Sequence, residues 1–378
     1  GSGRVGGDGV MAKLGEVCIQ ITDGSHNPPS GVEQSEYLML SSKNIDDDFI
    51  TLDSPRFLSR SDYIAENKRT TVSEGDLLMT IVGTIGRVAI VPEELKGICL
   101  QRSVAVIKPE REVVNNRYLM YQLQNMRPFL EKEARGVAQK GIYLKQVSQL
   151  DIKLPELEHQ MQIVKVLDKA SKLIFLRRQQ LAKMDELVKA QFVEMFGVVH
   201  NSVLYPYVPV KSFTSVVSGG TPNRNVSEFW NNGSIRWVKT TELQNNVICN
   251  TDEKITQAGL DNSSAKIIPP NTVLIAMYGQ GKTRGMTGYT SIECATNQAC
   301  ACILPCEQFN QNYLWRYMIL SYDKLRDMAK GGNQPNLNIG IIKNFPVLKP
   351  PIELQNDFAA FVERVDQQKQ TVQQSLEK

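Results

Sequence analysis

The part of this chain closest to a catalytic motif is residues 276–283, AMYGQGKT, a loosened form of the phosphate-binding loop of nucleotide hydrolases. That loop holds phosphates with glycine amides at the N-terminus of a helix, so a helix has to follow it. Residues 284–289 instead bring two more glycines and strand-like sequence. No apolar segment ending in a paired acid stands out as a magnesium site. The pattern therefore argues against nucleotide hydrolysis.

A second possible catalytic motif is residues 27–30, NPPS. It is similar to the Asn-Pro-Pro-aromatic tetrapeptide of amino-methyltransferases, in which the ring stacks on a flipped base. Serine takes the place of the ring here, and no glycine-rich strand-to-helix turn of the kind that holds S-adenosylmethionine is present. The simpler interpretation is a proline turn. The sequence thus predicts no bound cofactor, and any methylation would be carried out by a partner.

Four of the seven cysteines are clustered in the sequence. Cys294, Cys300, Cys302 and Cys306 lie close in sequence, which is a reason to consider zinc. There is no Cys-x-x-Cys and no nearby histidine, however, and residues 299–304 read as a strand with two thiols on one face. Buried, reduced thiols in a cytoplasmic protein are therefore the favoured interpretation, with no metal. The three histidines are scattered, so no histidine-based catalytic arrangement is legible.

Composition favours a globular protein with an uneven charge. Of the 378 residues, 42% are apolar, enough for two or three cores, and no apolar run approaches the roughly eighteen residues of a membrane span. Residues 201–350 carry 14 Lys+Arg against 9 Asp+Glu, whereas residues 11–155 carry 18 against 19. A polyanionic partner is thus indicated weakly, for the second segment only. Residues 1–10 read as a cloning remnant, and no signal peptide is expected.

The chain repeats itself at an offset that drifts from 196 to 195 residues, which is difficult to produce by chance. Each copy has an apolar segment that breaks into a polar turn, a buried strand ending in a glycine loop, a second strand, and one or two helices. The matched pairs are 14–27 with 210–223, 75–83 with 271–279, 101–109 with 297–305, 118–119 with 313–314, and 136–139 with 331–334.

Each copy ends in a long predicted helix that begins after a proline. Residues 155–197 contain no proline or glycine between the first residue and the last, and residues 351–378 contain none after the first. At about 1.5 Å per residue the first helix is roughly 60 Å long, too long for one small domain to cover. Apolar residues recur every seventh position and predict that the two helices pack together. This stripe comprises Leu167, Ile174, Leu181, Val188, Met195, Phe358, Val365 and Val372.

These patterns predict the α+β class: two similar mixed α/β globular domains of short strands, joined by two long antiparallel helices in a pseudo-two-fold arrangement. The expected boundaries are 11–154 and 198–349 for the domains, and 155–197 and 350–378 for the spacer helices. A long, repetitive ligand suits such a molecule. Duplex DNA fits best, because two half-sites about one helical turn, ~34 Å, apart match domains held apart by helices of this length.

The chain resembles the specificity subunits of type I DNA restriction-modification systems over residues 11–378. The motifs that carry the resemblance are the glycine loops followed by helix starts: residues 136–139 through 154–160, and residues 332–337 through 350–355. The resemblance implies two target-recognition domains that each read half of a split DNA target. It also implies that the helices bind two methyltransferase (modification) subunits, which motor-nuclease (restriction) subunits then join. We expect any extension completing the second helix to be absent or short.

Loop residues with side chains suited to DNA are the candidate contacts. Arg and Lys suit guanine, Asn and Gln suit adenine, and Ser and Thr suit phosphates. Because the two sets differ in chemistry, the two half-sites should differ in sequence. The first domain offers Ser25, His26, Asn27, Lys43, Asn44, Thr84, Arg87, Gln139, Lys140 and Tyr143, and the second offers Thr221, Asn223, Arg224, Lys239, Thr240, Thr241, Gln280, Lys282, Arg284, Asn333, Gln334 and Asn336.

One alternative remains open from sequence: a duplicated, non-catalytic scaffold whose domains bind proteins or another ligand. A DNA reader should show binding that falls steeply with salt and depends on sequence. The scaffold alternative predicts tight helix-mediated complexes without sequence preference. In either case the chain is expected to have no enzymatic activity of its own.

Overall fold

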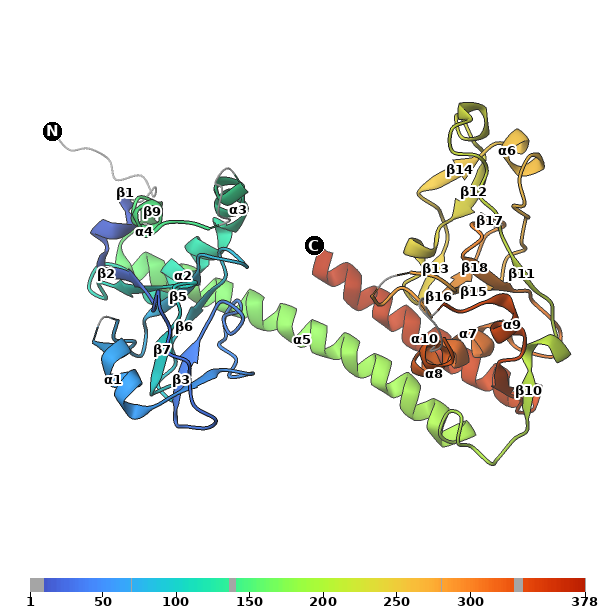
Figure 1. Ribbon diagram of the computed structural model, residues 1–378, viewed down its shortest axis with the longest axis horizontal. Helices are drawn as coiled ribbons and strands as arrows, with labels where there is room; N and C mark the ends of the chain where they lie inside the picture. Colours follow the sequence, from blue (N-terminus) through green and yellow to red (C-terminus); the bar gives the residue numbers. More distant parts are fainter. Residues whose placement is uncertain (1–9, 69, 136–140, 280, 330–335, 378) are drawn as a thin grey trace. The chain divides into compact units, whose positions relative to one another are not determined.

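The computed structural model describes residues 10–68, 70–135, 141–279, 281–329 and 336–377. Residue contacts divide the chain into two compact units, residues 1–173 and 174–378 (Figure 1). The division falls inside the longest helix, α5 (Leu157–Phe196), so its first part belongs to unit 1 and the rest to unit 2. Both units mix short strands with helices, and the predicted α+β class is confirmed.

Unit 1 contains a four-stranded sheet in the order β2-β8-β5-β6, a three-stranded sheet in the order β4-β3-β7, and the pair β1-β9. All neighbouring strands are antiparallel except β3 and β7. The strands are β1 (Val10–Lys13), β2 (Cys18–Asp23), β3 (Tyr37–Leu40), β4 (Arg56–Leu58), β5 (Leu77–Thr80), β6 (Val88–Ile90), β7 (Ile98–Leu100), β8 (Val104–Pro109) and β9 (Asp151–Leu154). The helices are η1 (Leu14–Glu16), α1 (Arg60–Asn67), α2 (Asn116–Asn125), α3 (Arg127–Arg135), α4 (Leu144–Ser148) and the first part of α5.

Unit 2 repeats this plan and adds a strand. Its sheets run β11-β18-β15-β16-β13, β14-β12-β17 and β10-β19, and the added β13 lies parallel to β16 at the edge. The strands are β10 (Tyr207–Pro209), β11 (Val216–Ser218), β12 (Ile235–Val238), β13 (Asn246–Ile248), β14 (Glu253–Ile255), β15 (Val273–Ala276), β16 (Thr287–Thr290), β17 (Ala295–Thr296), β18 (Cys300–Ile303) and β19 (Pro346–Leu348). The helices are η2 (Val210–Ser212), η3 (Ser227–Phe229), η4 (Thr240–Glu242), α6 (Gln257–Asp261), α7 (Gln311–Leu320), α8 (Tyr322–Met328), α9 (Ile339–Lys343) and α10 (Ile352–Glu377).

The repeat extends to individual hydrogen bonds at the starts of the helices. Asn115 caps α2 by accepting from the Arg117 and Tyr118 amides, and Asn310 caps α7 in the same way. The capping residue is itself held from the long helix. Gln160 of α5 accepts from the Asn115 amide at 2.8 Å, and Gln355 of α10 accepts from the Asn310 amide at 2.9 Å. Each long helix is thus fastened to its own unit by an equivalent buried glutamine.

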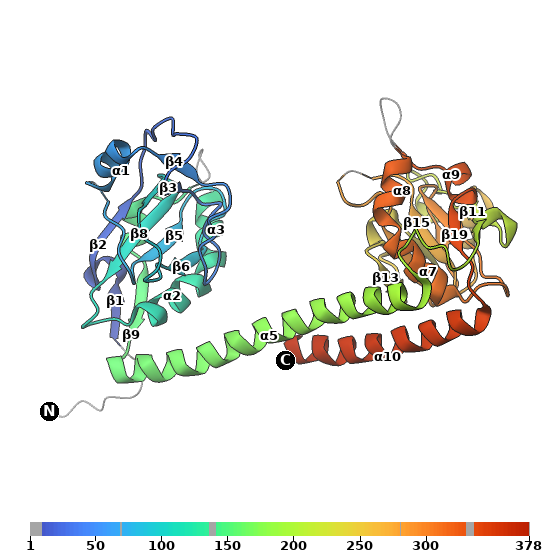
Figure 2. The same ribbon diagram turned by 90° about the horizontal axis from the view of Figure 1, so that it is seen from below.

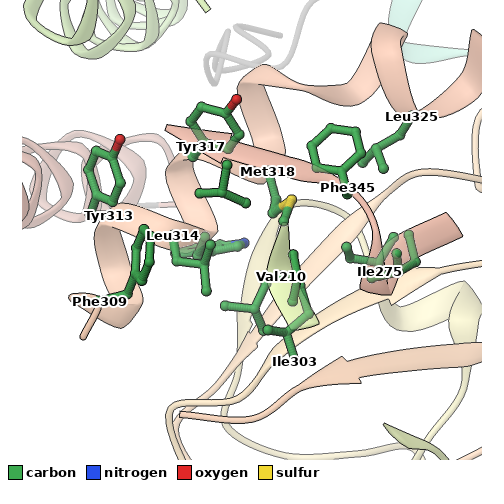
Figure 3. Packing of buried hydrophobic residues seen from close by; sticks show 14 of the residues in the cluster. Val210, Ile275, Ile303, Phe309, Tyr313, Leu314, Tyr317, Met318, Leu325 and Phe345 are labelled. Carbon is green, nitrogen blue, oxygen red and sulfur yellow. The ribbon is translucent and has the colours of Figure 1, made fainter. Parts of the chain in front are cut away.

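The core of unit 2 lies where α7 meets the five-stranded sheet and the long helices. Figure 3 shows Tyr313, Leu314, Tyr317 and Met318 of α7 among residues of the strands and loops around it. Tyr313 is fully buried, yet its hydroxyl donates to the Leu348 carbonyl at 3.0 Å, so no polar atom of the ring is left unpaired there. Tyr118 does the same in unit 1 through the Lys153 carbonyl.

Within unit 2, the second part of α5 packs antiparallel against α10 (Figure 2). Asp185 accepts an ion-paired hydrogen bond from Lys369, while Phe192 and Phe196, further along α5, contact Phe358, near the start of α10. Residue numbers therefore rise along one helix as they fall along the other. The packing of two long helices is as the heptad pattern predicted.

The predicted stripe is buried only where α10 covers it. Val188, Phe358, Val365 and Val372 are buried, and Met195 packs against the same core. Leu167 and Leu181 are half-buried, and Ile174 is 43% exposed. Outside the stripe, α5 exposes further large apolar side chains, including Val166, Leu173, Phe175, Leu176 and Leu187.

The two catalytic-looking segments have ordinary structural roles. After residues 276–283 the chain enters strand β16, and no helix follows, as the phosphate-loop mechanism would need. The carbonyls of Pro28 and Pro29 accept hydrogen bonds from Arg56 at 3.4 and 2.5 Å, which holds the proline turn against β4. The expected strand at residues 299–304 is β18, and both of its thiols, Cys300 and Cys302, lie in one buried cluster.

Burial makes the thiols of this chain unequal, which gives a first prediction. It raises the pKa of Cys18, Cys99, Cys294 and Cys302 to about 12, so at pH 8 only about 10⁻⁴ of each is the reactive thiolate. Cys249 is exposed. Ellman's reagent at pH 8 should modify Cys249 at least roughly 100-fold faster than these four. Loss of the fast phase in Cys249→Ser would support this. Because Cys306 is only half-buried, the contradicting result is a fast phase that survives in Cys249→Ser combined with Cys306→Ser.

Candidate nucleic-acid interface

The loops predicted to contact DNA in unit 1 converge at one end of its four-stranded sheet. β2 and β5 end there, and β6 and β8 begin there. Strands β3 and β7 of the three-stranded sheet end beside them, where Ser25 pairs with Gln101. Three contacts join the loops: Ser25 pairs with Gln101, the Ser42 amide donates to Ser103 at 3.1 Å, and Val82 pairs with Gly141. We call this set the unit 1 loop end, comprising residues 25–27, 41–44, 82–87, 101–103 and 141–143. It brings together segments more than a hundred residues apart in the sequence.

Two of the predicted contact residues point inward. Ser25 is 7% exposed, and its backbone pairs with the β7 end. Asn44 is 3% exposed; its side chain accepts from the Ser41 amide and donates to the carbonyls of Thr51 and Asp53. Asn44 therefore organises its loop. The exposed members of the loop end include His26, Asn27, Lys43, Thr84 and Tyr143.

The β5–β6 turn is built around glycines and fixed from α3. Gly83 and Gly86 both have positive φ, and a side chain on Gly86 would press on Arg127. The Arg127 guanidinium donates to the Gly86 carbonyl at 3.2 Å and pairs with Asp47. Arg87 lies 3.7 Å from Asp46. The positive charge at this turn is therefore partly balanced by acids of the neighbouring loop.

A hollow of about 520 Å³ lies beside the loop end. Asp23, His26, Arg102 and Tyr143 line its polar part, and Ile81 with its neighbours lines the apolar part. His26 Nε2 lies 2.8 Å from an Asp23 carboxylate oxygen. Arg102 was not predicted from the sequence, because it sits in a segment that reads as the start of a strand. It is exposed at the rim of the hollow.

Unit 2 forms an equivalent loop end, which we define as residues 220–224, 239–241, 282–285, 297–299 and 336–337. The Gly220 amide donates to the Thr296 carbonyl at 2.9 Å, matching Ser25 and Leu100 in unit 1 at 2.7 Å. The Leu337 amide donates to the Met277 carbonyl at 3.1 Å, matching Ile142 and Ile81 at 2.9 Å. The predicted residues Thr221, Asn223, Thr240, Thr241 and Asn336 lie here.

Two predicted cations of unit 2 are held by one carboxylate. Glu253 accepts from Arg224, and from Lys239 at 2.9 Å. The hydrogen bond from Arg224, together with that from Lys239, lowers the pKa of Glu253, and the hydrogen bond to Glu253 raises the pKa of Lys239. The Arg224 guanidinium also lies 3.8 Å from the ring centre of Trp230 and 4.8 Å from that of Trp237. Arg224 and Lys239 are therefore preorganised, and about half of their combined charge is balanced by Glu253.

The β15–β16 turn carries the more available cation. Lys282 is exposed, and its carbonyl accepts from Tyr322 at 2.7 Å. Arg326 of α8 donates to the carbonyls of Gly281 and Arg284 at 2.9 and 3.0 Å. Arg284 itself is half-buried. Helix α8 thus fixes the backbone of this turn as α3 does in unit 1. The remaining predicted residues, Gln139, Lys140, Gln280, Asn333 and Gln334, lie outside the described residues.

The described part of the chain offers little else for chemistry. In it, no three His, Cys, Asp or Glu side chains come close enough together to hold a metal ion. None of the described helices combines the length and the apolarity that a membrane span needs. What the two loop ends present is hydrogen-bonding and cationic side chains on fixed turns, a surface suited to recognition.

A family model and a curated relative both match this chain and point to the same family. Residues 40–185 and 205–378 match the model of the type I restriction modification DNA specificity domain. The specificity subunit of the type I restriction enzyme EcoR124I/EcoR124II from Escherichia coli is 27% identical over 152 residues. That alignment covers 39% of this chain and 37% of the relative, so the chain spans well under half the length of this relative.

Two solved structures share the fold. One, from a study of complex assembly and conformational transition of the type I R-M system, aligns with a TM-score of 0.57 at 18% identity, covering 99% of this chain and 94% of the other. The S subunit of a type I restriction-modification system from M. genitalium aligns with a TM-score of 0.56 at 12% identity, covering 99% and 93%. At these identities the likeness concerns the fold alone.

Proposed function

Because this chain belongs to the type I restriction modification DNA specificity domain family, we propose that it is the DNA-reading subunit of a type I restriction-modification complex. Residues 11–154 and 198–349 are the target-recognition domains in this proposal. Each reads one half of a split, asymmetric target in double-stranded DNA. Residues 155–197 and 350–378 form the helices that set the spacing between the half-sites. The chain itself catalyses no reaction.

The convergence of the loops is the observation that most supports DNA reading. Each unit collects five segments at one end of its main sheet, and backbone hydrogen bonds fix their positions. Base reading needs side chains held on such fixed turns, because discrimination depends on the geometry of paired donors and acceptors. The predicted contacts that remain exposed or half-exposed there include His26 and Lys43 in unit 1 and Thr221, Lys282 and Asn336 in unit 2.

The exposed apolar face of α5 supports a role in assembly. Leu173, Leu176 and Leu187 fall on one side of the helix at 3.6 residues per turn and are between 47% and 60% exposed, which is unusual for side chains of this size. We assign this face to the methyltransferase (modification) subunits, through which the motor-nuclease (restriction) subunits join. The stripe positions that pack on α10 are used within the chain, so partners contact the flanking faces.

The β15–β16 turn gives a test of DNA binding. Lys282→Ala combined with Arg284→Ala should weaken binding to target duplex about 10- to 100-fold, since it removes two cations from the phosphates. The slope of log affinity against log salt should also fall by about two. A gel-shift titration of the complex with its methyltransferase subunits, at several salt concentrations, measures both quantities.

The matched control removes the same charge from the other end of β11. Lys211 and Lys343 are both exposed and lie on η2 and at the end of α9, and Lys211→Ala plus Lys343→Ala should leave affinity within about twofold. Equal losses in the two double variants would mean that net charge, and not this turn, governs binding. If the unaltered complex shows no dependence on salt or sequence, the protein-binding scaffold becomes the better reading.

A further inference from the structure

The two loop ends share one backbone device at the turn after the first strand of the main sheet. A side chain on Gly24 would bring its Cβ to 2.0 Å from the Leu100 carbonyl oxygen, and one on Gly219 to 1.9 Å from the Thr296 carbonyl oxygen. Both turns therefore press directly on the strand end that precedes the start of β8 or β18. Only glycine allows so close an approach of two backbones. This close contact between backbones fixes the positions of the residues that follow each glycine and each strand end.

In each unit, one residue after the glycine turn and one residue after the strand end form a pair at equivalent positions. In unit 1 the pair is His26 and Arg102. The Arg102 backbone amide donates to the Ser25 carbonyl at 2.9 Å. In unit 2 the pair is Thr221 and Gln298, and the Thr221 hydroxyl donates to the Gln298 side-chain oxygen. Arg102 and Gln298 are both exposed. The scaffold is thus shared and the chemistry at its tip differs.

Each tip keeps hydrogen-bonding capacity unused. Among the residues the structure describes, no donor or acceptor pairs with the Arg102 guanidinium, which stands at the rim of the 520 Å³ hollow. Gln298 has one oxygen lone pair engaged by Thr221, which leaves a second lone pair and two amide hydrogens. Two parallel N–H donors match the O6 and N7 acceptors of guanine, whereas one donor beside one acceptor matches N7 and N6 of adenine.

Resting on the proposed function, we propose that Arg102 and Gln298 are the specificity-determining residues at the shared tip of the two domains: Arg102 reads a guanine in one half-site, and Gln298 reads an adenine at the equivalent position of the other. Thr221 positions the Gln298 side chain through its hydrogen bond, whereas His26 pairs with Asp23 beside Arg102. The asymmetry of the target then arises, at this position, from a single pair of residues on one duplicated scaffold.

Exchange of the two residues tests this. The complete complex with its methyltransferase subunits is used to select duplexes from a randomised library, and the enriched motifs are sequenced. Arg102→Gln should convert one guanine of one half-site to adenine, and Gln298→Arg should convert one adenine of the other half to guanine. At that position the preference should change by about 10- to 100-fold, while the opposite half-site stays the same.

Arg111→Gln is the matched control, because Arg111 is an exposed arginine beyond the other end of β8, where it donates to the Glu74 carbonyl. Its motif should equal that of the unaltered chain. Thermal melting of each variant should give the same transition as the unaltered chain, because the substituted side chains are exposed.

Three results would overturn the inference. An unchanged motif in Arg102→Gln and Gln298→Arg removes both residues from base reading. A uniform loss of affinity on all sequences, with the salt slope reduced by about one, makes Arg102 a phosphate contact. If the unaltered complex itself enriches no motif, the proposed function fails, and this result is distinct from the other two.

Discussion

Replacing Phe192 by alanine is expected to lower the free energy of unfolding of unit 2 by about 3–5 kcal/mol. Phe192 is fully buried at the junction of α5, α7 and α10. Its ring centre lies 5.5 Å from that of Phe358, 5.0 Å from that of Phe196 and 6.0 Å from that of Tyr313. Truncation removes these contacts and leaves a cavity where two long helices meet.

Denaturant unfolding followed by near-ultraviolet circular dichroism measures this effect. The neighbouring Val193→Ala is the control, because Val193 is 45% exposed on the same helix, and it should change the free energy of unfolding by no more than about 0.5 kcal/mol. Phe192→Ala should also leave the unfolding of unit 1 unaltered, since its contacts lie within unit 2. Similar small effects in both variants would mean that α5 and α10 do not pack as described.

Placing alanine at Gly24 or Gly219 is expected to abolish reading of one half-site at a time. The added Cβ would lie 2.0 or 1.9 Å from a backbone carbonyl oxygen, so the turn has to move by more than an ångström. Overpacking of this kind costs about 1–3 kcal/mol, and more where the neighbour is backbone. On the proposed function, Gly24→Ala should reduce discrimination in the unit 1 half-site by about 100-fold or more and spare the other half.

Library selection with the complete complex measures both halves in one experiment, and Gly219→Ala should give the reciprocal result. Each variant thereby serves as the control for the other. Loss of both half-sites in either variant would indicate global unfolding, which melting curves would show. Full retention of both would mean that the turns do not hold the reading residues.

The sequence predicted the parts of this fold that depend on periodicity and repetition. Proline-led, glycine-free stretches gave both long helices, and the constant offset gave two units of like plan. The strand at residues 299–304 followed from alternation, and the glycine loop after β5 followed from Gly83. These patterns depend on residues close together in the sequence, so they can be interpreted without knowing the tertiary contacts.

The parts that depend on tertiary contacts were not legible. Asn44 looks like an exposed amide in sequence, but its three hydrogen bonds turn it inward. Arg102 lies in an apparent strand, and only the pairing of Ser25 with Gln101 reveals that a turn exposes it. The stripe on α5 was predicted along its whole length, whereas α10 has 26 residues against 40, which leaves Ile174 exposed.

The sharing of Glu253 by Arg224 and Lys239 has a consequence for how tightly unit 2 holds any polyanion. On the proposed function, one carboxylate restrains two cations that would otherwise attract phosphates of every sequence equally. The ion pairs lower the non-specific affinity and so favour sequence discrimination, because a protein with high non-specific affinity is mostly bound at non-target sites. In this proposal Glu253 lowers the affinity of unit 2 for DNA of any sequence without having to contact the DNA itself.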